Sequence, residues 1–161
     1  MPLPDRTNQI IMKKQLIIET IVTLYTILFL YTSISKLMDL KIFEEQLASS
    51  PIVASFARPM AISIPFIELI LVILLTIPRF RMKGLIGSLI LMTCFTGYII
   101  TLFIIDDQLP CSCGGIIQQL SWEQHIVFNV IFIILLIVAI TFERHIKRSN
   151  HMPLSQVSSQ I

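Results

Sequence analysis

Four long apolar stretches constrain the fold of this chain more than any other feature of its sequence. They run from about residue 16 to 35, 59 to 78, 84 to 105 and 124 to 142. A helix needs about 20 mostly apolar residues to cross the hydrocarbon core of a bilayer, which is about 30 Å thick. Each stretch has this length, and a helix satisfies every backbone polar group within its own segment. The sequence therefore predicts an all-α fold, a bundle of four transmembrane helices.

The composition agrees with a membrane protein and excludes other classes. Of the 161 residues, 55% are hydrophobic and 14% are charged, whereas a soluble domain has about 25% charged residues. Disordered chains are poor in apolar residues, so disorder is excluded as well. The net charge of +2 gives no basis for nucleic-acid binding, which needs a clustered basic surface. We expect one membrane domain over residues 15–143, in contact with lipid, and tails at 1–14 and 144–161.

The distribution of lysine and arginine predicts the orientation of the bundle. Nine of the 12 basic residues lie in the two tails and in the short connection around residues 79–83, whereas residues 106–123 contain none. Because cytoplasmic segments of membrane proteins carry an excess of basic residues, both termini are predicted to be cytoplasmic. Segments 36–58 and 106–123 are then predicted to face outward. We expect a multi-pass protein of the cell inner membrane whose segment 106–123 faces the periplasm.

Two of the connections contain further structural signals. Pro78 and Gly84 bracket the connection between the second and third spans, which predicts a tight hairpin of antiparallel helices. The connection after the first span has apolar residues at helical spacing within the run DLKIFEEQL of residues 39–47. This spacing predicts a short amphipathic helix that lies on the outer surface of the membrane.

The most specific local motif is LPCSCGG, residues 109–115, in which only one residue separates Cys111 from Cys113. A disulfide across this spacing would close a very small ring, and strain makes such a bridge easy to reduce. Disulfides persist outside the cytoplasm, where this segment is predicted to lie. Cys111 and Cys113 are therefore the candidate catalytic residues of a thiol–disulfide exchange. A structural or inert cysteine pair is one alternative, and half of a zinc site is another. Because zinc needs two further Cys or His ligands, no metal is assigned.

Glu68 lies near the middle of the second span, where a carboxylate is costly and usually faces the interior of the bundle. One interpretation gives it a functional role. The other makes it an anchor that holds helices together through hydrogen bonds. In the second case, its expected partners are Tyr25 or Thr26 of the first span and Thr93 or Thr96 of the third.

Other polar residues in the spans are candidates for supporting roles. Lys36 ends the first span and is expected to snorkel to the outer surface, with stabilisation of a nearby thiolate as the alternative. His125 and Asn129 lie four residues apart on one face of the fourth span, as an interface pair or as a proton relay. Cys94 is expected to be a small buried apolar thiol. Glu19 lies near the cytoplasmic end of the first span and is expected to reach water.

Several segments together resemble a known family. The first span ends in YTSISKLMDLKIFEEQL, the second contains ISIPFIELILVILL, and the outward segment contains PCSCGG. These features are similar to those of the methylamine-utilisation protein family MauE, within the wider DoxX-like group of four-helix membrane proteins. The resemblance extends from about residue 15 to about residue 143. It implies a role in maturation of the disulfide-rich small subunit of periplasmic methylamine dehydrogenase.

Carried onto this chain, the resemblance matches Cys111 and Cys113 to the loop cysteines of the family, and Glu68 and Lys36 to recurring polar positions. The wider group resembles quinone-linked thiol oxidoreductases in architecture, so a quinone is the candidate cofactor. This chain lacks the C-x-x-C motif of those enzymes.

The sequence thus leads to one principal functional hypothesis and two alternatives. The principal hypothesis is an integral membrane protein that supports thiol–disulfide exchange, or maturation, of an extracytoplasmic client. Its partner would be a thioredoxin-like protein or the client itself, and Cys111 and Cys113 would be assisted by Glu68, Lys36 and His125. The first alternative is a non-catalytic small membrane subunit or assembly factor of a larger complex. The second is a proton-coupled carrier that uses Glu68, although carriers are typically built from repeats of more spans.

Overall fold

Helices are the only regular secondary structure in the part of the chain that the computed structural model describes, which comprises residues 6–105 and 122–150. Four helices in this part of the chain are long and apolar enough to cross a membrane. The prediction of an all-α protein with four spans is therefore confirmed. In chain order the elements are α1 (Arg6–Met38), α2 (Leu40–Ala48), the 3₁₀ helix η1 (Ala54–Phe56), α3 (Ala57–Thr76), α4 (Arg81–Ile105) and α5 (Trp122–Asn150).

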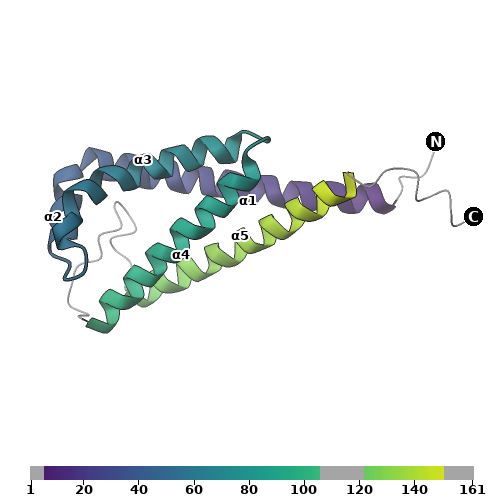
Figure 1. The fold of residues 1–161 in the computed structure, drawn as a ribbon. Helices are drawn as coiled ribbons and strands as arrows, with labels where there is room; N and C mark the ends of the chain where they lie inside the picture. The colour runs from purple at the N-terminus through teal and green to yellow at the C-terminus, as the bar shows by residue number, and fades with distance from the viewer. Residues whose placement is uncertain (1–5, 106–121, 151–161) are drawn as a thin grey trace, which may run out of the picture.

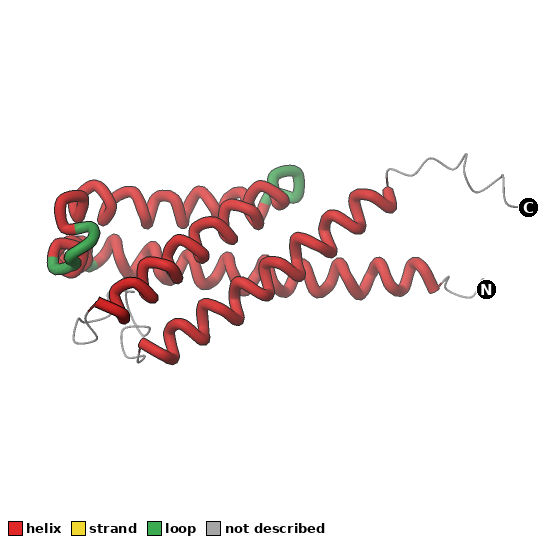
Figure 2. The backbone as a smooth tube through the Cα atoms, turned by 60° about the horizontal axis from the view of Figure 1, so that its bottom comes forward, coloured by secondary structure: helices red, strands yellow, loops and turns green. Residues whose placement is uncertain are grey.

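The four long helices alternate in direction along the bundle (Figure 1). Helix α1 packs against α3 and α5, and α4 packs against the same two helices. The start of α1 and the end of α5 lie toward one end of the bundle, together with the α3–α4 connection, and α2 lies at the opposite end (Figure 2). We call these the hairpin end and the α2 end. Both α1 and α5 extend beyond the apolar spans predicted for them.

The interior and the outer surface of the bundle have the polarity of a membrane protein. The main core contains apolar side chains from all four long helices, with Tyr25 at 0% exposure. The Tyr25 ring makes edge contacts with the rings of Phe29 and Phe132, at centroid distances of 5.6 and 5.3 Å. The outer surface carries large apolar side chains, and at least half of each of these isoleucines is exposed: Ile27, Ile70, Ile90 and Ile131. Such a continuous apolar exterior suits lipid rather than water.

The amphipathic helix predicted after the first span is present as α2. Its apolar residues Phe43 and Leu47 are buried and form a second cluster with Ala57 and Ala61 of α3. The small alanine side chains let α2 lie close against α3. The prediction that this apolar face rests on the membrane surface is therefore wrong for Phe43 and Leu47, because both pack on protein, whereas Ile42 remains exposed.

The connection between α3 and α4 is a tight hairpin, as predicted. Ile77 adopts an extended conformation, with φ −87° and ψ 113°, as expected for a residue that precedes a proline. The Phe80 N–H then donates to the Ile77 carbonyl at 2.9 Å. A Cβ atom at Gly84 would lie 2.9 Å from both the Leu74 carbonyl carbon and the Leu75 nitrogen. Only glycine allows the backbones of α3 and α4 to approach this closely.

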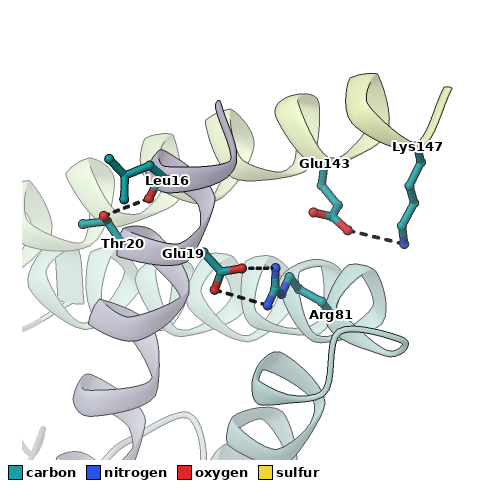
Figure 3. Close-up of polar contacts among 6 residues, drawn as sticks. All are labelled: Leu16, Glu19, Thr20, Arg81, Glu143 and Lys147. Carbon is teal, nitrogen blue, oxygen red and sulfur yellow. Dashed lines mark hydrogen bonds and ion pairs between the residues drawn. The ribbon is translucent and has the colours of Figure 1, made fainter. Parts of the chain in front are cut away.

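An ion pair joins α1 to α4 at the hairpin end (Figure 3). Arg81 donates from Nη1 to Glu19 Oε1 at 2.7 Å and from Nη2 to Glu19 Oε2 at 3.2 Å. This bidentate geometry is the preferred arrangement of arginine and a carboxylate. The Glu19 side chain is 46% exposed. It is thus accessible, as the sequence predicts, and it also links two helices.

Candidate functional site

A cavity of about 320 Å³ lies between the helices at the α2 end. Side chains from α1, α2, α3, α4 and α5 all line it. Helices α4 and α5 diverge from α1 and α3 toward this end, which separates the two helix pairs (Figure 1). The cavity is therefore a consequence of helix geometry, and its walls are mostly apolar with a few polar groups.

The strongest electrostatic feature of the cavity is an ion pair between Lys36 and Glu68. Lys36 Nζ lies 2.5 Å from Glu68 Oε1 and donates a hydrogen bond to it. Both residues line the cavity, and each is only 5% exposed. Lys36 comes from the last turn of α1 and Glu68 from the middle of α3. A buried charge is costly unless it is paired, so each of these residues requires the other.

This pair corrects the predictions for both residues. Lys36 is predicted to snorkel to the surface, but its side chain is turned into the bundle and contacts a carboxylate. The Lys36 Nζ atom also lies 5.7 Å from the centre of the Phe43 ring, so α2 covers it.

The partners predicted for Glu68 are also wrong. The Thr93 and Thr96 hydroxyls donate to carbonyls of their own helix, at 2.7 and 2.6 Å. Among the described residues, the Tyr25 and Thr26 hydroxyls have no hydrogen-bond partner. A cation satisfies a buried carboxylate better than a hydroxyl does, and Lys36 can reach Glu68 because α1 and α3 are direct neighbours.

His125 and Asn129 line the same cavity from α5. Each is 2% exposed, and the His125 ring centre lies 6.1 Å from that of Phe95 on α4. Their predicted position on one face of the fourth span is confirmed, and this face borders the cavity. The structure thus brings together Lys36, Glu68 and His125, which the sequence names separately as supporting residues.

Two polar atoms at the cavity have unused hydrogen-bonding capacity. Within residues 6–105 and 122–150, Glu68 Oε2 and Asn129 Nδ2 are buried without a hydrogen-bond partner. One is an acceptor and the other a donor. Buried polar groups in native proteins are almost always hydrogen-bonded, so each exception requires an explanation.

Cys94 differs from its prediction. It is expected to be a buried apolar thiol, but it is exposed and lines the cavity from α4. Phe95 and Tyr98, its neighbours on α4, also line the cavity. The apolar third span contains no charge to mark which of its faces borders a cavity, so the sequence has no signal for this position.

Cys111 and Cys113 lie outside the described residues, within the segment that connects Ile105 to Trp122. The flanking ends of α4 and α5 lie at the α2 end, and Leu102 and His125 near these ends line the cavity. In the described part of the chain, no group of three or more His, Cys, Asp or Glu residues could hold a metal ion.

Four apolar helices around a partly polar cavity define the class of the protein, a small multi-pass membrane protein. The family model for the methylamine utilisation protein MauE matches residues 14–142, which is most of the chain. The protein therefore belongs to the MauE family, as its sequence resemblance indicates. No curated protein and no solved structure was found to match the chain.

Proposed function

We propose that the protein exchanges disulfides with an extracytoplasmic client through Cys111 and Cys113. The observation that carries this proposal is the C-x-C motif in the connection between α4 and α5. Membership of the MauE family supports it, as do the helix ends that anchor this connection beside the cavity. A connection anchored on two rigid helices can present thiols to a partner protein.

The exchange moves two electrons and two protons between two pairs of sulfur atoms. A client thiolate attacks one sulfur of the Cys111–Cys113 disulfide, which forms a mixed disulfide and releases the other cysteine as a thiolate. The second client thiolate then attacks the mixed disulfide. The client leaves oxidised, and Cys111 and Cys113 are left reduced. The same steps in reverse, with the disulfide of a thioredoxin-like protein as the oxidant, restore the Cys111–Cys113 disulfide.

The cavity residues support this exchange through position. Lys36 and Glu68 join α1 to α3 beneath α2, and His125 lies in the first turns of α5. In the proposal these contacts hold the helix ends from which the cysteine connection extends. They are positioning residues and do not contact the client.

The proposal also requires that the α2 end faces the periplasm of an inner membrane. The charge distribution supports this orientation, because Arg79, Arg81 and Lys83 all lie at the hairpin end. Basic residues favour the cytoplasmic side of the membrane.

Labelling with a membrane-impermeant maleimide tests the exchange in intact cells. A Cys94→Ala background leaves Cys111 and Cys113 as the only thiols of the chain. We expect little labelling before reductant is added and labelling of two thiols afterwards. Labelling that never changes with redox state would contradict the proposal.

Two further variants complete the experiment. Lys83→Cys, in a background without other cysteines, places a thiol at the hairpin end and should resist labelling until the membrane is permeabilised. The double variant Cys111→Ser/Cys113→Ser tests for a catalytic role. Full retention of function in cells would favour the alternative, a non-catalytic subunit or assembly factor.

A further inference from the structure

We propose that the cavity at the α2 end binds the ring of an uncharged, lipid-soluble quinol. The inference goes beyond the thiol exchange and does not depend on Cys111 or Cys113. It is based on the charge of the cavity, its unused hydrogen-bonding atoms and its aromatic walls.

The charge of the cavity favours an uncharged ligand. Lys36 and Glu68 are paired at 2.5 Å, so their charges offset each other. An anion or a cation that entered the cavity would be desolvated there, with no opposite charge left to compensate it. An ionic lipid headgroup is excluded by the same argument.

The unused hydrogen-bonding atoms favour a ligand that can both donate and accept. Glu68 Oε2 is an acceptor and Asn129 Nδ2 is a donor, and neither has a partner among the described residues. Both side chains line the cavity. Their terminal torsions are broad and soft, so a small rotation turns either atom toward a ligand. A hydrocarbon chain would leave both atoms unsatisfied, and burial of unsatisfied polar groups opposes binding.

A quinol satisfies both atoms at once. One of its hydroxyl groups can donate to Glu68 Oε2, and the oxygen of the other can accept from Asn129 Nδ2. The oxidised quinone has two carbonyl acceptors and no donor. It can therefore satisfy Asn129, but it leaves Glu68 Oε2 without a partner. This difference predicts that the cavity binds the quinol more tightly than the quinone.

The walls and the size of the cavity suit a flat ring. Phe43, Phe95, Tyr98 and Phe128 line the cavity from three different helices, and aromatic side chains pack well against the face or edge of another ring. The volume of about 320 Å³ is at the lower limit of about 300–1,000 Å³ for small-molecule sites. This volume accommodates the ring, and an isoprenoid tail would extend into the membrane.

Binding to the purified full chain in lipid nanodiscs tests the proposal. The probes are a short-chain dimethoxybenzoquinol, measured anaerobically, and its oxidised quinone, with the dissociation constant determined by calorimetry. We expect the quinol to bind about tenfold more tightly, which is the effect of one hydrogen bond to a charged group. Equal affinity for the two forms would overturn the proposal.

Two variants identify the atoms involved. Asn129→Leu should weaken both forms by about tenfold, because both accept a hydrogen bond from the amide. Glu68→Gln can keep an oxygen toward Lys36 and replace Oε2 with an NH₂ donor, so it should reverse the preference in favour of the quinone. If Glu68→Gln fails to fold, Asn129→Leu and the wild-type preference still decide the matter.

Matched controls show whether the ligand occupies this cavity. Ser88→Ala also removes a buried hydroxyl that lacks a partner among the described residues, but Ser88 does not line the cavity. It should leave both affinities unchanged, and a loss equal to that of Asn129→Leu would contradict the assignment. Cys111→Ser/Cys113→Ser should also bind normally, even if it abolishes thiol exchange. A simple alkane that binds as tightly as the quinol would identify an acyl-chain site and overturn the proposal.

Discussion

The two ends of the bundle each contain an ion pair that involves α1, but the two pairs are built differently. At the hairpin end, Arg81 contacts both carboxylate oxygens of Glu19, at 2.7 and 3.2 Å. At the α2 end, Lys36 contacts only Oε1 of Glu68, and Oε2 has no partner in the described part of the chain. One carboxylate is thus saturated by its partner, whereas the other retains an acceptor.

The packing around the two pairs differs in the same way. Near Arg81, Gly84 brings the backbone of α4 against that of α3. Near Glu68, α4 and α5 diverge, and a cavity separates the helices. A closely packed end with a saturated ion pair fixes the bundle, and a hollow end with spare hydrogen-bonding capacity can accept a ligand. The comparison therefore assigns stability to the hairpin end and binding to the α2 end.

The largest effect should come from breaking the buried pair. Lys36→Met leaves the Glu68 carboxylate buried without its cation, and we expect it to lower the free energy of unfolding by about 3–5 kcal/mol. The measurement is a denaturant titration in mixed micelles, followed by circular dichroism. An effect of this size would show that the hollow end also depends on its charges for stability.

A double variant provides the control for this effect. Lys36→Met/Glu68→Leu removes both charges and fills the space with apolar atoms, so it should recover most of the lost stability. If the double variant is as unstable as the single one, the loss comes from packing of the Lys36 side chain and not from the unpaired charge.

The close approach at the hairpin end should give the next largest effect. Gly84→Ala would place Cβ 2.9 Å from backbone atoms of Leu74 and Leu75, and overpacking of this kind costs about 1–3 kcal/mol. The matched control is Gly97→Ala on the same helix, where a Cβ would meet nothing within 4 Å. This control should be neutral or more stable by up to about 1 kcal/mol, because alanine is the better helix former. Equal losses in both variants would contradict the close packing at the hairpin end.

The sequence predicts the helices of both ends better than their side-chain partners. Length and hydropathy identify the four spans because a bilayer requires apolar segments of one length. Pro78 ends α3 for local steric reasons, so the hairpin is also predictable. These features depend on near neighbours in the chain.

The pairing of Lys36 with Glu68 depends on how two helices are rotated about their axes. The residues are 32 positions apart, and the rotation follows from packing of the whole core. Hydropathy alone gives Lys36 two options, the surface or the interior, and general preference favours the surface. Cys94 shows the same limitation, because a uniformly apolar span does not indicate which of its faces borders a cavity.

A third variant examines the region of α1 between the two ion pairs. Tyr25 is fully buried, and its hydroxyl has no hydrogen-bond partner among the described residues. Tyr25→Phe keeps the ring contacts with Phe29 and Phe132 and removes the unsatisfied group. We expect unfolding stability to rise by about 1 kcal/mol, as measured in the same titration. A loss of stability would mean that the hydroxyl has a partner, and that the middle of α1 resembles the α2 end more than the hairpin end.

The smallest effect should come from the ion pair at the hairpin end, although its geometry is the better of the two. The Glu19 side chain is 46% exposed, so its surroundings screen the charges, and exposed pairs contribute only about 0–1 kcal/mol. Glu19→Gln should therefore change unfolding stability by less than Gly84→Ala does. Added salt should shrink the difference further, because exposed pairs are screened. A loss as large as that of Lys36→Met would reverse the comparison, since it would show that the saturated pair, and not the buried one, carries the larger electrostatic contribution.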